Sequence, residues 1–166
     1  MRLIRVILLV AIATGLAACG ERSKFRTYNG PEVTRIDVYK GARRMDLVHH
    51  DRVLRSFDIA LGREPVGQKE REGDGRTPEG VYFIDRRNPN SSYHLSLGIS
   101  YPEPSDRLRA EEAGDDPGGD IFIHGRGPNH PNARGDWTEG CIAVTDRQME
   151  DIYAMVRLGT PIVIRP

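Results

Sequence analysis

The sequence lacks a net charge. Lysine plus arginine and aspartate plus glutamate are balanced at 24 each in a chain of 166 residues. Because a balanced chain has no broad field to attract a charged polymer, nothing in the composition indicates a nucleic-acid partner. Binding must therefore come from a local site.

The sequence also has no apolar stretch near its start that is long enough to span a bilayer. The apolar run over residues 6–16 contains 11 residues, whereas a membrane-spanning helix needs about 20. The basic residues Arg2 and Arg5 precede this run. This arrangement predicts an export signal peptide over residues 1–18.

The small residues before Cys19 resemble the lipobox of bacterial lipoproteins. We therefore expect Cys19 to be the lipid attachment site and residues 19–32 to form a lipid-anchored tether. The alternative is an ordinary cleavage site that happens to precede a cysteine. Gly20 favours the outer membrane over the inner one, so we expect the protein at the periplasmic face of a bacterial membrane.

Cysteine is scarce, with two residues in the chain. If Cys19 carries lipid, Cys141 stays unpaired in a compartment that oxidises thiols. An unpaired thiol there is either a reactive group or a buried, inert cysteine. Metal-ligand spacing is missing among His49, His50, His94 and His130, so we expect no metal site. We also expect no cofactor.

Short β-rich segments separated by turns dominate residues 33–166, which we predict to form one catalytic domain. We expect an antiparallel meander first, then further strands. The predicted strands cover residues 33–40, 44–49, 53–61, 81–84, 93–100, 121–123 and 162–164. The expected fold is mainly β, a single β-sandwich or partly closed barrel with one or two short helices.

Two helices are predicted. The first covers residues 105–113. The second begins at Thr145, because Thr145 and Gln148 have the spacing of a capping box, and we expect it to end at Gly159.

Two segments place a reactive residue where a strand meets a glycine-rich loop. His124 follows the strand at 121–123 and precedes Gly125, and Cys141 follows Gly140. A thiol needs a neighbour that takes its proton or lowers its pKa, and histidine is suited to this. We expect an imidazolium to make the Cys141 thiolate the main form near neutral pH, with main-chain N–H groups around Gly140 stabilising an oxyanion.

Together these segments resemble the YkuD-type L,D-transpeptidase catalytic domain. The resemblance implies that Cys141 is the nucleophile, that His124 is its base and that the Gly125 carbonyl orients the histidine ring. It runs over residues 36–164 and rests on three blocks, at residues 73–82, 121–125 and 138–144. Within the first block, Pro78 and Gly80 fix the chain path, which favours a scaffold role over substrate contact.

The nucleophile motif departs from the family pattern. Members commonly have Ser-His-Gly-Cys, an apolar residue and then Arg or Asn, whereas residues 138–143 here are Thr-Glu-Gly-Cys-Ile-Ala. This form resembles the murein-active subgroup, which includes transpeptidases and an amidase, so the reaction outcome stays open. We expect substrate or oxyanion contacts from Gly140, Thr138, Trp137 and Arg126. The alternative for Trp137 and Arg126 is a packing residue and a solvated loop charge.

The resemblance implies a peptidoglycan L,D-transpeptidase, a cysteine acyltransferase. Cys141 would form a thioester with the stem tetrapeptide and pass the acyl group to an amine. Two alternatives remain: a murein peptide hydrolase or amidase with the same Cys–His site, and a non-catalytic wall-binding lipoprotein. The expected partners are peptidoglycan stem peptides and, through the anchor, a membrane, and we expect a monomer.

Overall fold

The computed structural model describes residues 23–166. The expected signal peptide over residues 1–18 and the expected lipid site at Cys19 lie outside the described residues. Within residues 23–166, every helix is too short or too polar to cross a bilayer.

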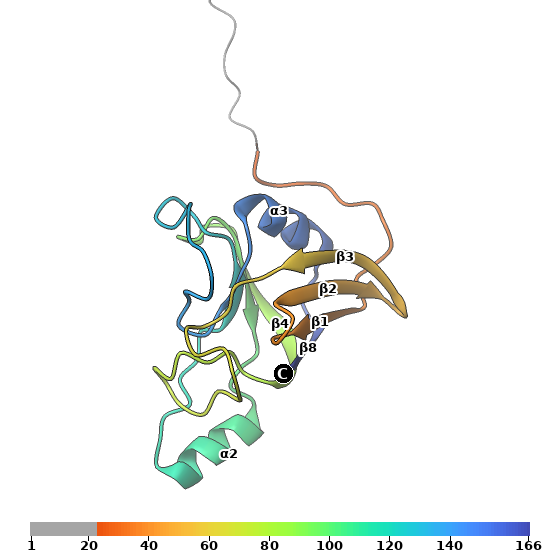
Figure 1. Cartoon of the computed structure of the whole chain (residues 1–166). Helices are drawn as coiled ribbons and strands as arrows, with labels where there is room; N and C mark the ends of the chain where they lie inside the picture. Colours follow the sequence, from red (N-terminus) through yellow and green to blue (C-terminus); the bar gives the residue numbers. More distant parts are fainter. Residues whose placement is uncertain (1–22) are drawn as a thin grey trace, which may run out of the picture.

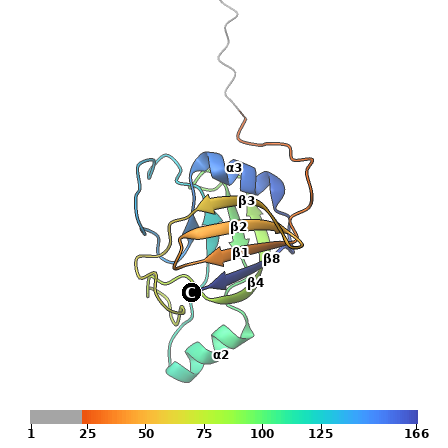
Figure 2. The ribbon, with the colours of Figure 1, turned by 45° about the vertical axis from the view of Figure 1, so that its right-hand side comes forward.

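Eight strands form one sheet in the order β3-β2-β1-β8-β4-β5-β6-β7, which curls into an open half-barrel (Figures 1 and 2). The chain starts with the antiparallel meander that the sequence predicts. The strands are β1 (Arg35–Tyr39), β2 (Arg44–His49), β3 (Arg52–Asp58), β4 (Gly80–Asn88), β5 (Ser96–Ile99), β6 (Phe122–His124), β7 (Ile142–Ala143) and β8 (Pro161–Arg165). Two pairs are parallel, β1 with β8 and β6 with β7.

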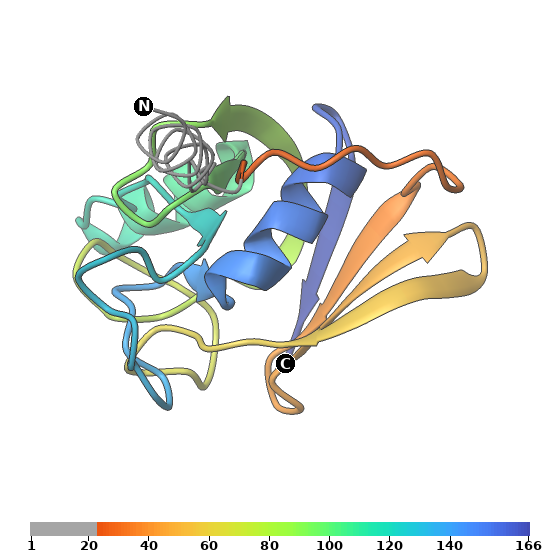
Figure 3. The ribbon, with the colours of Figure 1, turned by 90° about the horizontal axis from the view of Figure 1, so that it is seen from above.

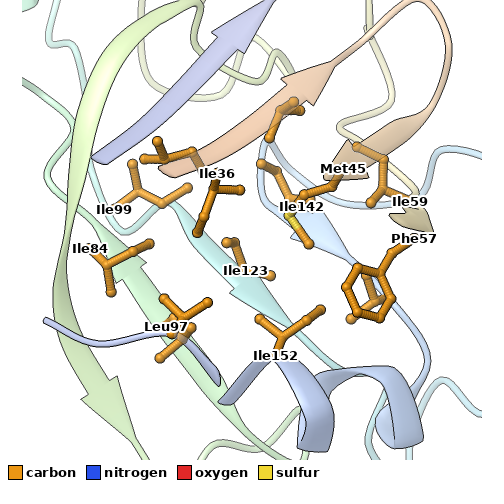
Figure 4. Packing of buried hydrophobic residues seen from close by; sticks show 14 of the residues in the cluster. Ile36, Met45, Phe57, Ile59, Ile84, Leu97, Ile99, Ile123, Ile142 and Ile152 are labelled. Carbon is orange, nitrogen blue, oxygen red and sulfur yellow. The ribbon is translucent and has the colours of Figure 1, made fainter. Parts of the chain in front are cut away.

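The helix α3 (Asp146–Met155) lies in the opening of the curl, between β1–β3 and the strands from β4 onward (Figure 3). Its Met149 and Ile152 are fully buried and belong to the same apolar cluster as the inward side chains of the strands (Figure 4). Each buried side chain of this size contributes about 1.5–3 kcal/mol. The curled sheet and α3 therefore share one core.

The start of α3 is as predicted, because Thr145 and Gln148 form the capping box. Its predicted end at Gly159 is wrong. The helix stops at Met155, since Val156 is already extended. Gly159 belongs to the turn before β8, where its N–H donates to the Ile84 carbonyl.

The other helix, α2 (Pro104–Ala113), projects away from the sheet (Figure 1). It begins one residue before its predicted start and ends where predicted. Only Asp106 and Ala110 of this helix are buried.

The two edges of the sheet approach each other, which makes the fold a partly closed barrel. Ala60, just after β3, exchanges two main-chain hydrogen bonds with Ala143 of β7 (2.9 and 2.8 Å). A further bridge joins Gly62 to Thr138. The expected mainly β fold class is confirmed, and these bridges fasten residues 138–143 across the seam between the sheet edges.

Candidate active site

His124 ends β6, which lies next to the edge strand β7, and its sheet neighbours are Ser96 of β5 and Ala143 of β7. Only 4% of the residue is exposed. Its Nδ1 lies 2.6 Å from the Gly125 carbonyl oxygen. A carbonyl only accepts, so Nδ1 carries the proton and Nε2 of the neutral ring holds the free lone pair.

The loop after His124 is held by the first residue of α3. Asp146 Oδ1 accepts the main-chain N–H groups of Arg126 (2.6 Å) and Gly127 (2.9 Å). A Cβ at Gly125 would lie 2.5 Å from this Oδ1 and 2.7 Å from the Tyr93 carbonyl oxygen. Only glycine fits between them, and this close packing fixes the carbonyl that orients the His124 ring.

The turn that carries Cys141 is stabilised from within by Thr138. The Thr138 hydroxyl donates to the Cys141 carbonyl (2.7 Å) and accepts the Gly140 N–H (3.2 Å). Gly140 has a φ of +128°, and a Cβ there would lie 2.6 Å from the Arg76 carbonyl oxygen. Gly140 is therefore required by both its backbone conformation and its contact with the segment around Arg76.

That segment is tied to the sheet by a buried lysine. Lys40 is 2% exposed, and its ammonium donates to the Thr77 carbonyl (2.8 Å), the Gly67 carbonyl (2.5 Å) and the Glu79 carboxylate (2.9 Å). These contacts fit the scaffold role expected for the block at residues 73–82.

Cys141 is half-buried. The hydrogen bond of its sulfur goes to the main-chain oxygen of Asp120, at 3.5 Å. Asp120 has a φ of +54°, in the left-handed region that a non-glycine residue seldom adopts.

Burial raises the pKa of the Cys141 thiol, with the Asp120 charge acting in the same direction and a hydrogen bond from Phe122 acting against it. Burial also lowers the pKa of His124, although its bond to Gly125 acts the other way. Both shifts favour the neutral forms. These directions are opposite to those needed for the expected thiolate and imidazolium.

Two cavities meet at this pair, and Tyr93, His124 and Cys141 line both. One, of about 290 Å³, also includes Ser96, Asp120 and Phe122 among its walls. The other, of about 190 Å³, is completed by a second set of residues: Arg63, His130, Trp137, Thr138 and Glu139. The structure therefore joins segments that are far apart in the chain at one place.

The predicted site residues fall into two groups. His124 and Cys141 share both cavities, and Trp137 and Thr138 line the smaller one. Arg126 lines neither. Its side chain faces a third cavity, of about 380 Å³, on the α3 side of the loop.

An aromatic cluster surrounds His124 and was not predicted from the sequence. The Tyr93 ring lies 4.5 Å from the His124 ring, measured between centroids, and the Trp137 ring meets His124 edge-on at 5.7 Å. His130 stacks on Trp137 at 4.7 Å. The sequence does hold a signal for part of this cluster. The loop over residues 125–137 joins the His124 and Cys141 motifs, so its His130 and Trp137 must lie near both.

Among residues 23–166, no cluster of three or more His, Cys, Asp and Glu side chains is arranged to hold a metal ion.

Comparisons with known proteins agree on one family. The family model of the YkuD L,D-transpeptidase catalytic domain matches residues 33–164. The Escherichia coli (strain K12) protein YafK, which carries the name of an L,D-transpeptidase, is 29% identical over 128 residues, which is 73% of this chain and 46% of YafK.

Solved structures show the same fold. The cell shape determining protein Pgp2 from Campylobacter jejuni aligns with a TM-score of 0.63 and 24% identity, over 88% of this chain and 52% of Pgp2. An L,D-transpeptidase from Mycobacterium smegmatis aligns with a TM-score of 0.54 and 14% identity, over 81% of this chain and 59% of that protein. This chain spans about half the length of YafK and Pgp2.

Proposed function

Because the chain belongs to the YkuD L,D-transpeptidase catalytic domain family, we propose that it is a peptidoglycan L,D-transpeptidase with Cys141 as its nucleophile. The observation that carries this proposal is the shared position of His124 and Cys141 in the walls of two cavities, with the histidine proton held on Nδ1 by Gly125. A base with its lone pair on Nε2 and a half-buried thiol that lines both cavities form the pair that acyl transfer needs.

The first step forms the acyl-enzyme. As the Cys141 sulfur attacks the carbonyl of the L-to-D peptide bond in a tetrapeptide stem, its proton moves to His124 Nε2. The tetrahedral intermediate then collapses, the C–N bond breaks, and D-alanine leaves as an amine with the proton from His124. The acyl group remains on sulfur as a thioester.

The second step transfers the acyl group to an acceptor. An amine from a neighbouring stem attacks the thioester and gives a proton to His124, and the released thiolate takes that proton back. Two cavities that meet at the sulfur support this scheme, because the donor and the acceptor each need a place beside it. No cofactor is part of the scheme.

A carbapenem tests the nucleophile. We expect the purified protein to gain the mass of one opened carbapenem on the peptide that contains Cys141, and Cys141→Ala to gain none there. The His124→Gln variant should acylate far more slowly, since its thiol has no base. An unmodified Cys141, or full activity in Cys141→Ala, would overturn the proposal.

Hydrolysis is the second candidate function. Glu139 lines the smaller cavity with Cys141 and pairs with Arg63 at its rim, so its carboxylate is placed to orient a water molecule toward a thioester. Mass spectrometry of peptidoglycan digested after incubation separates the two outcomes. Cross-linked dimers support transfer, and released fragments without dimers support hydrolysis.

We further propose that the enzyme works at the periplasmic face of a bacterial membrane, anchored by lipid on Cys19. The support is the apolar run over residues 6–16 and the small residues before Cys19. Metabolic labelling with a tagged fatty acid should mark the protein, and Cys19→Ala should remove the label.

A further inference from the structure

The largest of the three cavities lies behind the loop that carries Trp137. It has a volume of about 380 Å³ and is lined by the end of β3, the loop over residues 125–137, β7 and the start of α3, together with Arg43. Neither His124 nor Cys141 is among its walls, so it is separate from the candidate active site. Its size falls within the range of small-molecule sites, roughly 300–1,000 Å³.

The charged walls of this cavity are mostly cationic. Arg43 is neutralised by Asp136, whose carboxylate accepts from its Nε (3.1 and 3.0 Å) and Nη2 (2.7 Å). Within residues 23–166, Arg126 and Arg134 form no ion pair, and neither does the exposed Asp58. Two guanidinium groups against one carboxylate leave the cavity with an excess of positive charge.

The start of α3 also borders this cavity. Thr145 and Gln148 line the cavity at the N-terminal end of the helix, where the peptide dipoles place partial positive charge. Asp146 turns its Oδ1 to the Arg126 and Gly127 N–H groups. Guanidinium groups bind carboxylates with paired hydrogen bonds, so the charge of the site suits an anion.

The rest of the wall is apolar. The apolar residues that line this cavity include Ile59, Ala60, Val144 and Trp137. A small inorganic ion would leave these groups in contact with water, whereas an organic acid with a short hydrocarbon part would cover them.

From this combination we infer that the cavity is a second, non-catalytic binding site for a peptide end that bears a free carboxylate beside a small apolar side chain. In peptidoglycan, the D-alanine end of a stem peptide has this chemistry, and that identification rests on the proposed function. The site would hold one stem on the α3 side of the loop while Cys141 acts on another.

Trp137 provides the reporter for a test. It is the only tryptophan in the chain, and it lines this cavity as well as the smaller one beside Cys141. The probe is N-acetyl-D-alanine, titrated into the Cys141→Ala protein while tryptophan emission is followed. We expect a saturable change, and none with the amide of the same compound, which lacks the carboxylate.

Three substitutions locate the binding. Arg134→Gln, in the exposed part of the wall, should weaken binding at least tenfold. Arg147→Gln, an exposed arginine of α3 outside the cavity, and Arg63→Gln, in the wall of the smaller cavity, should leave binding unchanged. A second arm repeats the titration with a stem tetrapeptide, for which Arg134→Gln should again weaken binding.

The proposal is overturned if emission does not change saturably, if Arg134→Gln binds as the parent does, or if Arg63→Gln alone abolishes the change. The first arm uses a variant without the thiol, so it is independent of acyl transfer. A protein that shows no transpeptidation but passes this test would lose the proposed function and keep the second site.

Discussion

At the scale of single residues, the chemistry depends on two groups that burial keeps neutral. Burial raises the pKa of the Cys141 thiol and lowers that of His124. If Cys141 is the nucleophile, as proposed, proton transfer would accompany sulfur attack rather than precede it in the free enzyme. The proposed mechanism would then activate the sulfur only when a carbonyl is in place.

The pH dependence of alkylation measures this property. Iodoacetamide reacts with thiolate, so its rate at Cys141 should be low at neutral pH and should keep rising through and above the ordinary thiol pKa of about 8.5. Because the pKa of His124 is lowered, the ring should stay unprotonated at pH values where an ordinary histidine gains a proton, and acyl transfer should decline only in more acidic solution. Peptide mapping identifies the alkylated cysteine, and kcat/KM against pH gives the acid limb.

A preformed ion pair would give another profile. A thiolate held by an imidazolium would alkylate at a constant rate over several pH units, down to the low pKa of the pair. Such a plateau would contradict neutral resting groups at His124 and Cys141. The Cys141→Ala variant is the control for labelling elsewhere in the chain.

The placement of His124 and Cys141 at one site could be predicted because His124-Gly125 and Gly140-Cys141 are local patterns. The pKa shifts of Cys141 and His124 could not be predicted, since they depend on how far the fold removes both groups from water. The strand predicted over residues 93–100 begins only at Ser96, so Tyr93 lies outside it and is exposed beside His124. Its position follows from the loop before β5, which sequence alternation does not describe.

At the scale of elements, α3 has two roles. Its apolar side chains fill the curl of the sheet, and Asp146 in its first turn holds the loop after His124. The helix therefore couples the core to the Gly125 carbonyl that orients the His124 ring.

Replacement of Asp146 tests this coupling. Asp146→Ala removes the acceptor of two main-chain N–H groups, and we expect a loss of about 2 kcal/mol in the free energy of unfolding. Because the Gly125 carbonyl is then less well fixed, kcat should fall about tenfold or more. Asp146→Asn keeps an oxygen in the same place and should restore most of kcat, which a purely structural cost would not explain.

Arg147→Ala is the matched control on the same helix. This side chain is exposed, so its removal should change stability by less than about 0.5 kcal/mol. Denaturant unfolding and steady-state kinetics on the four proteins give both quantities. An Asp146→Ala enzyme with the parent's kcat would show that the loop is held without this carboxylate.

Elements with a clear local pattern were predicted well, and those defined by distant partners were not. Thr145 and Gln148 mark the helix start through contacts three residues apart. The two residues of β7 are too few for a periodic pattern, and they form a strand only because β6 lies beside them. The parallel pairing of β1 with β8 joins the two ends of the domain, which no local signal reveals.

At the scale of the whole molecule, the segment before β1 is fastened to the domain. Lys24 donates to the Pro89 carbonyl (2.6 Å) and the His94 carbonyl (3.2 Å). Arg26 pairs with Glu150 (2.6 Å) and Asp151 on α3. Part of the expected tether over residues 19–32 is thus docked against the helix.

Hydrogen exchange tests the docking. In Arg26→Ala, main-chain amides around residues 24–28 should exchange faster than in the parent, while those of the β-strands should not change. Raising the ionic strength should act in the same direction, because salt screens partly exposed ion pairs. Arg55→Ala, an exposed arginine on β3, is the control, and equal exchange in Arg26→Ala and this control would argue against docking.

If Cys19 carries lipid, as proposed, this docking limits the distance between the membrane and the folded domain. From Cys19 to Lys24 there are five residue steps, which extend to about 18 Å at most, whereas the thirteen steps to Glu32 would extend to about 46 Å. A tether that ends at Lys24 would keep the candidate active site close to the membrane that carries the proposed lipid anchor. Releasing both Lys24 and Arg26 would lengthen this tether and let the domain reach farther from the membrane.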